Sequence, residues 1–178
     1  LTVNKPHSIS FHPEGTNTAG DLGAAASLTY QHRNVFKGSE LLSLELRGAY
    51  ENIKGLEGYS NEDFLEYSVE AKLQFPRFIA PFIARPFIKS TQSSSELSLM
   101  YDLQNRPEYH RRVLSLAWKY KWNYTNHHDR YWIDLLDLNY VFMPWISDTF
   151  RHDYLEDDTN RNAILRYNYE NLFIMKFG

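Results

Sequence analysis

The sequence predicts an all-β protein, an antiparallel transmembrane β-barrel of which about eight strands are present. Long stretches alternate apolar residues with polar or charged ones, as strands do when their two faces meet different environments. These stretches run for roughly 9–12 residues, which is enough to cross a bilayer at a tilt, whereas strands of globular proteins average about 5–6. Trp and Tyr gather at strand ends, as they do at membrane interfaces.

The first half of the chain supplies four predicted strands. The first, residues 8–14, leads into a predicted turn over 15–21, and the second covers 23–33. A short connection, 34–39, leads to the third strand at 42–50, which is followed by a longer polar loop, 51–63. The fourth strand, FLEYSVEAKLQF at 64–75, has the sharpest contrast between its two sides, and prolines at 76, 81 and 86 end it.

The second half supplies four more. The predicted strands are 93–101, 112–122, 131–142 and the start of an eighth at 171–177, with a loop at 102–110 and a turn at 123–129. In the seventh strand Asp134 falls on the apolar register, which predicts a bulge or an early end to burial. A short helix is expected at about 147–154, within the polar stretch after Pro144.

The two sides of these strands predict which solvent each side meets. In a soluble barrel the apolar side would fill the interior. In a membrane barrel the apolar side faces lipid and the charged side faces an aqueous lumen, where ion pairs form at little desolvation cost. The residues predicted to face the lumen are Glu45, Arg47, Glu66, Glu70, Lys72, Glu96, Lys119 and Lys121. Those predicted to face lipid are Leu44, Leu65, Tyr67, Val69, Leu73, Leu97, Leu99, Leu116, Trp118, Tyr120 and Trp122.

Two further patterns favour the membrane barrel. Connections alternate between short and long, which predicts short turns on one rim and longer loops on the other. Aromatic residues close the sixth strand and open the seventh, so they flank one turn and predict an aromatic girdle on one rim. These residues are Trp118, Tyr120, Trp122, Tyr124, Tyr131 and Trp132.

Composition fits this class and excludes others. The net charge is −3, so nothing in the charge points to nucleic acid. There is no cysteine, which excludes disulfide scaffolds and thiolate metal sites. The mean hydropathy of −0.54 is compatible with a membrane barrel, whose lumen residues offset its lipid-facing ones. The chain starts at Leu1 without a visible leader and resembles a mature piece or a fragment of one domain, 1–178.

The segments also resemble a known family. KPHSISFHPEGTNTAGDLGAAASLTYQHRNVFKGSELLSLELRGAYE (5–51) resembles the first three barrel strands of outer-membrane assembly factors of the BamA/TamA type, in particular the surface-antigen-like members of Bacteroidetes. The passages EGTNTAG, SLTYQHRNVFKGSE and LQFPRFIAPF carry the likeness most clearly. It covers most of the chain, is strongest over 5–82 and weakens after Pro144.

The resemblance implies the first half of a 16-stranded barrel in the Gram-negative outer membrane, without the soluble periplasmic modules that precede such barrels. It implies a non-enzymatic role, in which client outer-membrane proteins are inserted or translocated through a lateral seam, with periplasmic or lipoprotein partners. The first strand would form the seam, and its residues are Ser8, Ile9, Ser10, Phe11, His12, Pro13 and Glu14. Pro13 either weakens this edge or simply ends the strand.

No enzymatic, cofactor or metal site is predicted. His127, His128 and Asp129 are the one tempting metal cluster, but they lie in a predicted turn and adjacent residues of a strand would point apart. Glu66 and Glu70 lie about 13 Å apart along a strand, too far for a carboxylate dyad. The acids Glu156, Asp157 and Asp158 fit a solvated loop better than a calcium site. Three alternatives stay open: a passive eight-stranded outer-membrane barrel with a structural or adhesive role, a soluble ligand-binding barrel, and a membrane-embedded lipase.

Overall fold

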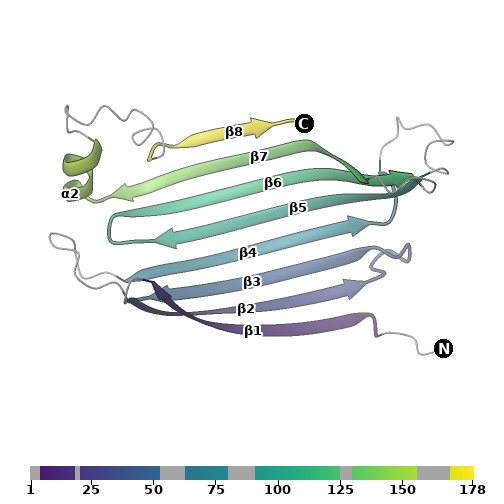
Figure 1. Cartoon of the computed structure of the whole chain (residues 1–178), viewed down its shortest axis with the longest axis horizontal. Coiled ribbons are helices and arrows are strands. Elements are labelled where there is room, and N and C mark those ends of the chain that lie inside the picture. The colour runs from purple at the N-terminus through teal and green to yellow at the C-terminus, as the bar shows by residue number, and fades with distance from the viewer. Residues whose placement is uncertain (1–4, 19–20, 53–62, 80–90, 125–129, 156–168) are drawn as a thin grey trace.

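The described residues fold into a single antiparallel sheet of eight strands, in which every strand pairs with its neighbours in sequence (Figure 1). The computed structural model describes residues 5–18, 21–52, 63–79, 91–124, 130–155 and 169–178. The strands are β1 (His7–Thr18), β2 (Asp21–Arg33), β3 (Leu41–Glu51), β4 (Phe64–Phe75), β5 (Thr91–Asn105), β6 (Tyr109–Tyr124), β7 (Arg130–Ile146) and β8 (Leu172–Lys176). The predicted all-β antiparallel architecture is confirmed at this level.

Most strands run further than the sequence pattern predicts. β4 has the predicted bounds, but β1 continues through the predicted turn at 15–21 as far as Thr18. β5 and β6 extend into the predicted loop at 102–110, leaving only 106–108 between them. Both predictions are wrong because cross-strand pairing continues there, from Gly15 opposite Ala24 and from Asp102 opposite Val113. Polar residues in these stretches look like loop residues in sequence but are paired strand residues in the sheet.

Pro13 lies inside β1, opposite Ala26, so the alternative that it ends the strand is wrong. The N–H of Arg33 donates to the carbonyl of Pro6 at 2.8 Å, which makes this pair a hydrogen-bonded one. Hydrogen-bonded and non-hydrogen-bonded pairs alternate along an antiparallel ladder. Pro13 therefore falls at a non-hydrogen-bonded position, where its missing N–H would have pointed away from β2. An edge strand tolerates proline at such a position.

The irregularity predicted near Asp134 is present in β7. A first register shift lies between His110 and Arg112. From Arg112 opposite Phe142 the pairs are regular as far as Trp118 opposite Leu136, and the next pair is Lys119 opposite Asp134. Leu135 is thus an extra residue, as in a β-bulge. Because of it, Asp134 moves off the apolar register and lies beside Lys119, with Oδ1 3.7 Å from the lysine Nζ.

Between β7 and β8 lies the short helical stretch that the sequence predicts at 147–154. It consists of α2 (Asp148–Phe150) and a wider turn, η1 (Arg151–Leu155). The backbone N–H of Ser147 donates to the carbonyl of Glu108 at 2.9 Å, which anchors the start of α2 to the β5–β6 turn. None of the helices in the described ranges is long and apolar enough to cross a membrane.

The lengths of the connections do not separate the two rims of the sheet. The rim that carries α2, on the left of Figure 1 and called here the helix rim, has connections 19–20, 52–63, 106–108 and 147–171. The opposite rim has 34–40, 76–90 and 125–129. The predicted division into a rim of short turns and a rim of long loops is therefore wrong, because the strand extensions shorten some predicted loops and not others.

The sheet is a single layer with very little core. Its accessible surface is 12882 Å², whereas a folded monomer of 21.1 kDa exposes about 9,000 Å². The buried hydrophobic residues among those described are Ala25, Phe64, Phe78, Val113, Tyr120 and Val141. No second layer packs on either face within the described chain, so the fold leaves both faces available to other surroundings (Figure 1).

Candidate functional site

One face of the sheet is apolar across all eight strands, and we call it the apolar face. The cross-strand register aligns one residue from each strand into a continuous row. In strand order this row is Phe11, Leu28, Leu46, Val69, Tyr101, Leu114, Tyr140 and Phe173. A second row beside it is Ile9, Tyr30, Leu44, Ala71, Leu99, Leu116, Leu138 and Met175. All residues predicted to face lipid lie on this face.

The apolar face is also the open one. All eight members of the first row are exposed, by 42% to 64%. A soluble monomer rarely exposes a contiguous apolar patch of more than a few hundred square ångströms, and larger patches mark contact with a membrane or another protein. Contact of these residues with lipid itself stays a prediction.

Tyr120 is an exception on the apolar face, because a segment of the chain covers it. The ring of Phe78 packs edge-on against it at 5.3 Å, and the Tyr120 hydroxyl donates to the carbonyl of Ile79 at 2.7 Å. Ser95, directly opposite Tyr120, accepts from the N–H of Ile79 and donates to the carbonyl of Arg77. Tyr120 is therefore buried, and the prediction that it contacts lipid is wrong for this residue. The pattern of β6 alone contains no sign of this cover.

The other face, called here the polar face, carries all eight residues predicted to line a lumen. Although their side chains are long, seven of the eight residues are only partly exposed, with the Glu66 and Glu96 side chains at 18% and 15%, whereas the Lys121 side chain is 50% exposed. This crowding indicates that the polar face is the concave one. Arg47 pairs with Glu66, and Lys72 Nζ lies 3.1 Å from Glu70 Oε1.

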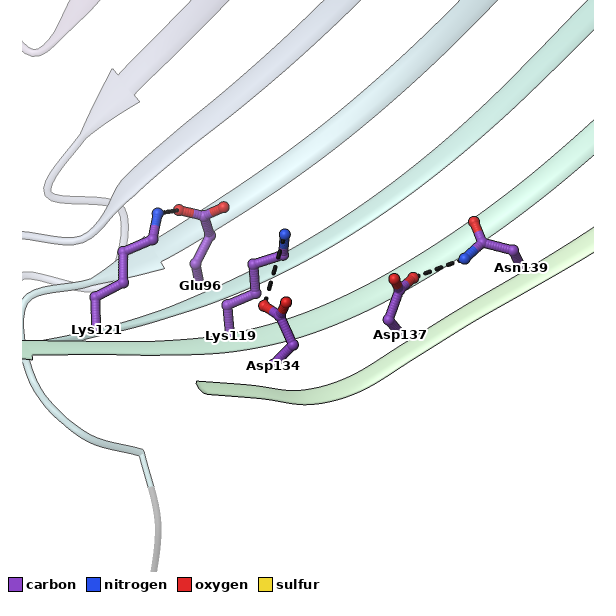
Figure 2. A network of polar contacts seen from close by, with 6 residues as sticks. All are labelled: Glu96, Lys119, Lys121, Asp134, Asp137 and Asn139. Carbon is purple, nitrogen blue, oxygen red and sulfur yellow. Dashed lines mark hydrogen bonds and ion pairs between the residues drawn. The ribbon is translucent and has the colours of Figure 1, made fainter. Parts of the chain in front are cut away.

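A further polar network crosses β5, β6 and β7 on the same face (Figure 2). Lys121 Nζ lies 2.9 Å from Glu96 Oε2, and Lys119 pairs with Asp134 through the bulge in β7. Asn139 donates to Asp137 at 2.7 Å. Ion pairs across neighbouring strands hold these charges in place while leaving them in contact with solvent, as expected for a hydrated surface.

Sequence reasoning missed several members of the polar face. Gln104 donates to Glu66 at 3.4 Å and lies opposite Arg111, in the stretch that was predicted to be a loop. Asp134 was predicted only as an irregularity. The signal that could have found Gln104 is the set of polar residues on the register of Glu96, namely Ser98, Asp102 and Gln104, which only Met100 interrupts. The residues that extend the polar face in this way are Ser98, Asp102, Gln104, Arg111, Asp137 and Asn139.

A cluster of aromatic rings lies at the helix rim of the sheet. The guanidinium carbon of Arg106 lies 4.5 Å from the ring centroid of Phe64 and 6.0 Å from that of Tyr109. Tyr109 packs edge-on against Tyr169 at 5.3 Å, and Phe150 of α2 completes the cluster at 4.9 Å from Tyr169. Burial raises the pKa of the Tyr169 hydroxyl above its usual value. This cluster joins the β5–β6 turn, α2 and the start of β8 into one unit.

The predicted aromatic girdle is present only in part. Trp122 and Tyr131 are cross-strand partners on the apolar face, and their rings stack at 5.7 Å. Trp132, however, pairs with Lys121 and so lies on the polar face. Neighbouring residues of a strand point to opposite sides, so Tyr131 and Trp132 cannot both belong to a girdle. The side chain of Tyr124 lies outside the described residues.

β1 forms one open edge of the sheet and β8 the other. Within the described chain β1 pairs only with β2, and β8 only with β7. All seven residues predicted to form a seam lie in β1 and are exposed. Like Pro13, Ile9 and Phe11 occupy non-hydrogen-bonded positions of the β1–β2 ladder. Their backbone N–H and C=O groups therefore point away from β2, toward the open edge.

The described residues offer little other chemistry. No group of three or more His, Cys, Asp or Glu side chains comes close enough in them to hold a metal ion. The tempting cluster His127, His128 and Asp129 and the acids Glu156, Asp157 and Asp158 lie outside the described residues.

Comparisons of the chain with protein-family models, with curated proteins and with solved structures give no match.

Proposed function

We propose that this sheet is a sector of a transmembrane β-barrel in the Gram-negative outer membrane, with its apolar face toward lipid and its polar face toward a hydrated lumen. One observation carries the proposal: an exposed apolar row that crosses all eight strands. Burying this row in hydrocarbon removes it from water without a second protein layer. Each strand from β1 to β7 is long enough to cross a bilayer at a tilt, whereas β8 is shorter.

The polar face supports the same orientation. Burying its ion pairs in a dry core would incur a desolvation cost that such pairs rarely offset. A soluble barrel with the apolar face inside would need that face to be enclosed, yet Tyr67 and Val69 are 53% and 49% exposed. The soluble barrel is therefore the weaker candidate.

The open edges favour a sector over a closed eight-stranded barrel. In the described chain β1 and β8 share no backbone pair, and backbone groups at a membrane-embedded edge must find partners. Further strands, from this protein or from another chain, would supply them. A passive barrel of eight strands needs a β1–β8 ladder, which none of the described pairs provides.

For the activity we propose insertion or translocation of client outer-membrane proteins, as the resemblance to assembly factors implies. The β1 edge would pair with a client strand through its backbone, which is β-augmentation and needs no covalent step. Pro13 removes one donor from this edge, so pairing there is weaker than along an uninterrupted strand.

The orientation can be tested with single cysteines, because the chain has none of its own. In the full-length protein in outer membranes, we place cysteine at Leu46 or Leu99 and, as matched controls in the same strands, at Glu45 or Ser98. A water-soluble maleimide should label the controls at least about tenfold faster, because thiolates do not form in hydrocarbon. Equal labelling at both positions of each strand would exclude the proposed orientation.

The activity can be tested at the β1 edge. The double variant Ile9→Pro, Phe11→Pro removes two outward N–H donors and leaves the hydrogen-bonded pairs with β2 in place. In liposomes containing the full-length protein, this variant should slow the folding of an added unfolded outer-membrane barrel protein. The control Ile9→Val, Phe11→Leu keeps the donors and should retain the wild-type rate. If the proline variant folds and still accelerates insertion at the wild-type rate, the β1 edge is not the client site. The cysteine-labelling experiment still decides independently which face meets lipid.

A further inference from the structure

A small patch on the polar face at the opposite rim combines groups that the barrel architecture does not require. Three strands contribute two rows to it. Gln92 of β5, Asn123 of β6 and Arg130 of β7 form the outer row, and Ser94, Lys121 and Trp132 form the inner row. The six side chains share one face because cross-strand partners point to the same side of a sheet.

These residues line a cavity of about 310 Å³. This volume is at the lower end of the range for small-molecule sites, roughly 300–1,000 Å³. A neighbouring cavity of about 500 Å³, lined in part by Gln74 and Thr91, shares Gln92, Ser94 and Asn123 with it. We call these two adjoining cavities the groove. Its lining includes the amides of Gln74, Gln92 and Asn123, the hydroxyls of Thr91 and Ser94, and the aromatic residues Trp122 and Tyr131.

Trp132 is the unusual member of the patch. It is 72% exposed, the highest exposure among the large hydrophobic residues described. It lies on the polar face, so neither lipid contact nor a girdle accounts for it. A broad ring that is open to water on a polar surface offers a flat stacking platform, and the C–H faces of a sugar ring bind such platforms.

The charges of the patch favour an acidic ligand. Two cations, Lys121 and Arg130, line the cavity, and no carboxylate does. Lys121 is held in place by Glu96 at 2.9 Å, as Figure 2 shows. Arg130 makes no ion pair or hydrogen bond within the part of the chain that the structure describes, so its guanidinium is available for an acidic group.

We propose that this groove binds an acidic oligosaccharide, with one sugar ring stacked on Trp132, its carboxylate or phosphate on Arg130, and its hydroxyls on the amides of Gln92 and Asn123. The two amides approach each other only weakly, at 3.4 Å, and both present donors and acceptors that match sugar hydroxyls. This binding site is independent of the proposed client insertion, which uses the far edge of the sheet.

The test is a calorimetric titration of the full-length protein in detergent with three probes: an oligogalacturonate, a maltooligosaccharide of equal length, and inorganic phosphate. The oligogalacturonate should bind at least about tenfold more tightly than either of the others, because only it offers both a ring for Trp132 and a carboxylate for a charge-assisted hydrogen bond with Arg130. Absence of binding to the oligogalacturonate overturns the proposal. So does equal binding of phosphate, which would show an adventitious ion site with no recognition of sugar.

Two variants divide the roles within the groove. Trp132→Ala should weaken binding of both saccharides by about tenfold, the contribution of one good ring contact. Arg130→Gln should abolish the preference for the acidic saccharide and leave the neutral one unchanged. Trp145→Ala, at the helix rim and 39% exposed, is the matched control and should bind as wild type. Circular dichroism checks that each variant is folded. A folded Trp132→Ala variant with unchanged affinity would overturn the stacking site.

Discussion

At the scale of single residues, the turn between β2 and β3 depends on one carboxylate. Glu40 is only 2% exposed, and its carboxylate accepts from the N–H groups of Gly38 at 2.9 Å and Phe36 at 3.2 Å. Desolvation would raise the pKa of Glu40, but these hydrogen bonds, that of its own N–H and the charge of Arg77 hold the pKa below its usual value. The turn therefore uses the ionised form of Glu40.

Replacing Glu40 by Gln should destabilise the protein in a way that depends on pH. Because the folded pKa lies below the unfolded one, the contribution of Glu40 is fully present above the unfolded value of about 4.3 and is lost as the pH falls through the folded value. Urea unfolding of the full-length protein should show a gap between wild type and Glu40→Gln at pH 7 that narrows as the pH falls below the unfolded pKa of Glu40. A gap that stays constant with pH would contradict this reading of the turn.

The same turn explains why position 38 is glycine. A Cβ at Gly38 would overlap Oε1 of Glu40, so Gly38→Ala must displace the carboxylate from the backbone N–H groups. We expect Gly38→Ala to lower the unfolding midpoint in wild type but much less in the Glu40→Gln background. Additive effects of the two substitutions would show that they act separately.

A second residue-level prediction concerns Glu45. It lies opposite Glu70 on the polar face, and it makes no ion pair or hydrogen bond within the described residues. Like charges directly opposite destabilise a sheet, whereas an opposite-charge pair contributes about 0.2–1 kcal/mol. Glu45→Lys should therefore raise the free energy of unfolding by about 0.5 kcal/mol, less so in high salt, with Glu45→Gln in between. A loss of stability in Glu45→Lys would exclude repulsion as the dominant effect.

At the scale of elements, the bulge in β7 allows a test by deletion. Removing Leu135 leaves Leu136 opposite Trp118 and Asp134 opposite Lys119, so both faces keep their residues. We expect this deletion to change the free energy of unfolding by less than about 1 kcal/mol. Removing Tyr140 instead shifts Leu136 and Leu138 to the polar face or breaks the ladder, and should cost several times more. Equal costs for the two deletions would show that the bulge does not separate two registers.

The elements also show what the sequence could predict. The two faces of β4 and the irregularity near Asp134 were predictable, because alternation along one strand is a local property. The ends of β1 and β5 were not, because Thr18 and Asp102 remain in strands only through pairing with residues that are distant in sequence. The cover over Tyr120 was also hidden, since it depends on the path of the chain after β4.

The patch around Trp132 was missed for a related reason. The position of Trp132 near a strand end predicts a place in an aromatic girdle. The face on which Trp132 lies, however, is set by its pairing with Lys121. Counting from Leu136 without the bulge also puts position 132 on the apolar side. Only the extra residue, Leu135, moves Trp132 to the polar face.

At the scale of the whole molecule, one pair of substitutions separates lipid from water on the apolar face. Val69 and Ser68 are adjacent in β4 and lie on opposite faces. In a bilayer, Val69→Arg should reduce the free energy of unfolding by about 2–4 kcal/mol. Ser68→Arg, between Asp102 and Arg47 of the two neighbouring strands, should change it by less than about 1 kcal/mol, because the attraction and the repulsion offset each other. Measurement in lipid vesicles checks both. If Val69→Arg is tolerated as well as Ser68→Arg, the apolar face meets water or a polar partner.

Shortening an apolar side chain should destabilise a one-layer sheet less than it destabilises a packed core. In a close-packed interior, Leu→Ala costs about 2–5 kcal/mol, and part of that cost comes from the void left among interlocking neighbours. Leu46 and Leu99 are exposed, and no side chain of the described residues packs over them, so a shortened residue there leaves no void among the described residues. Aliphatic residues at these positions should therefore replace one another freely during evolution. Related proteins would then keep the alternation of apolar and polar positions while the identities of the apolar residues diverge.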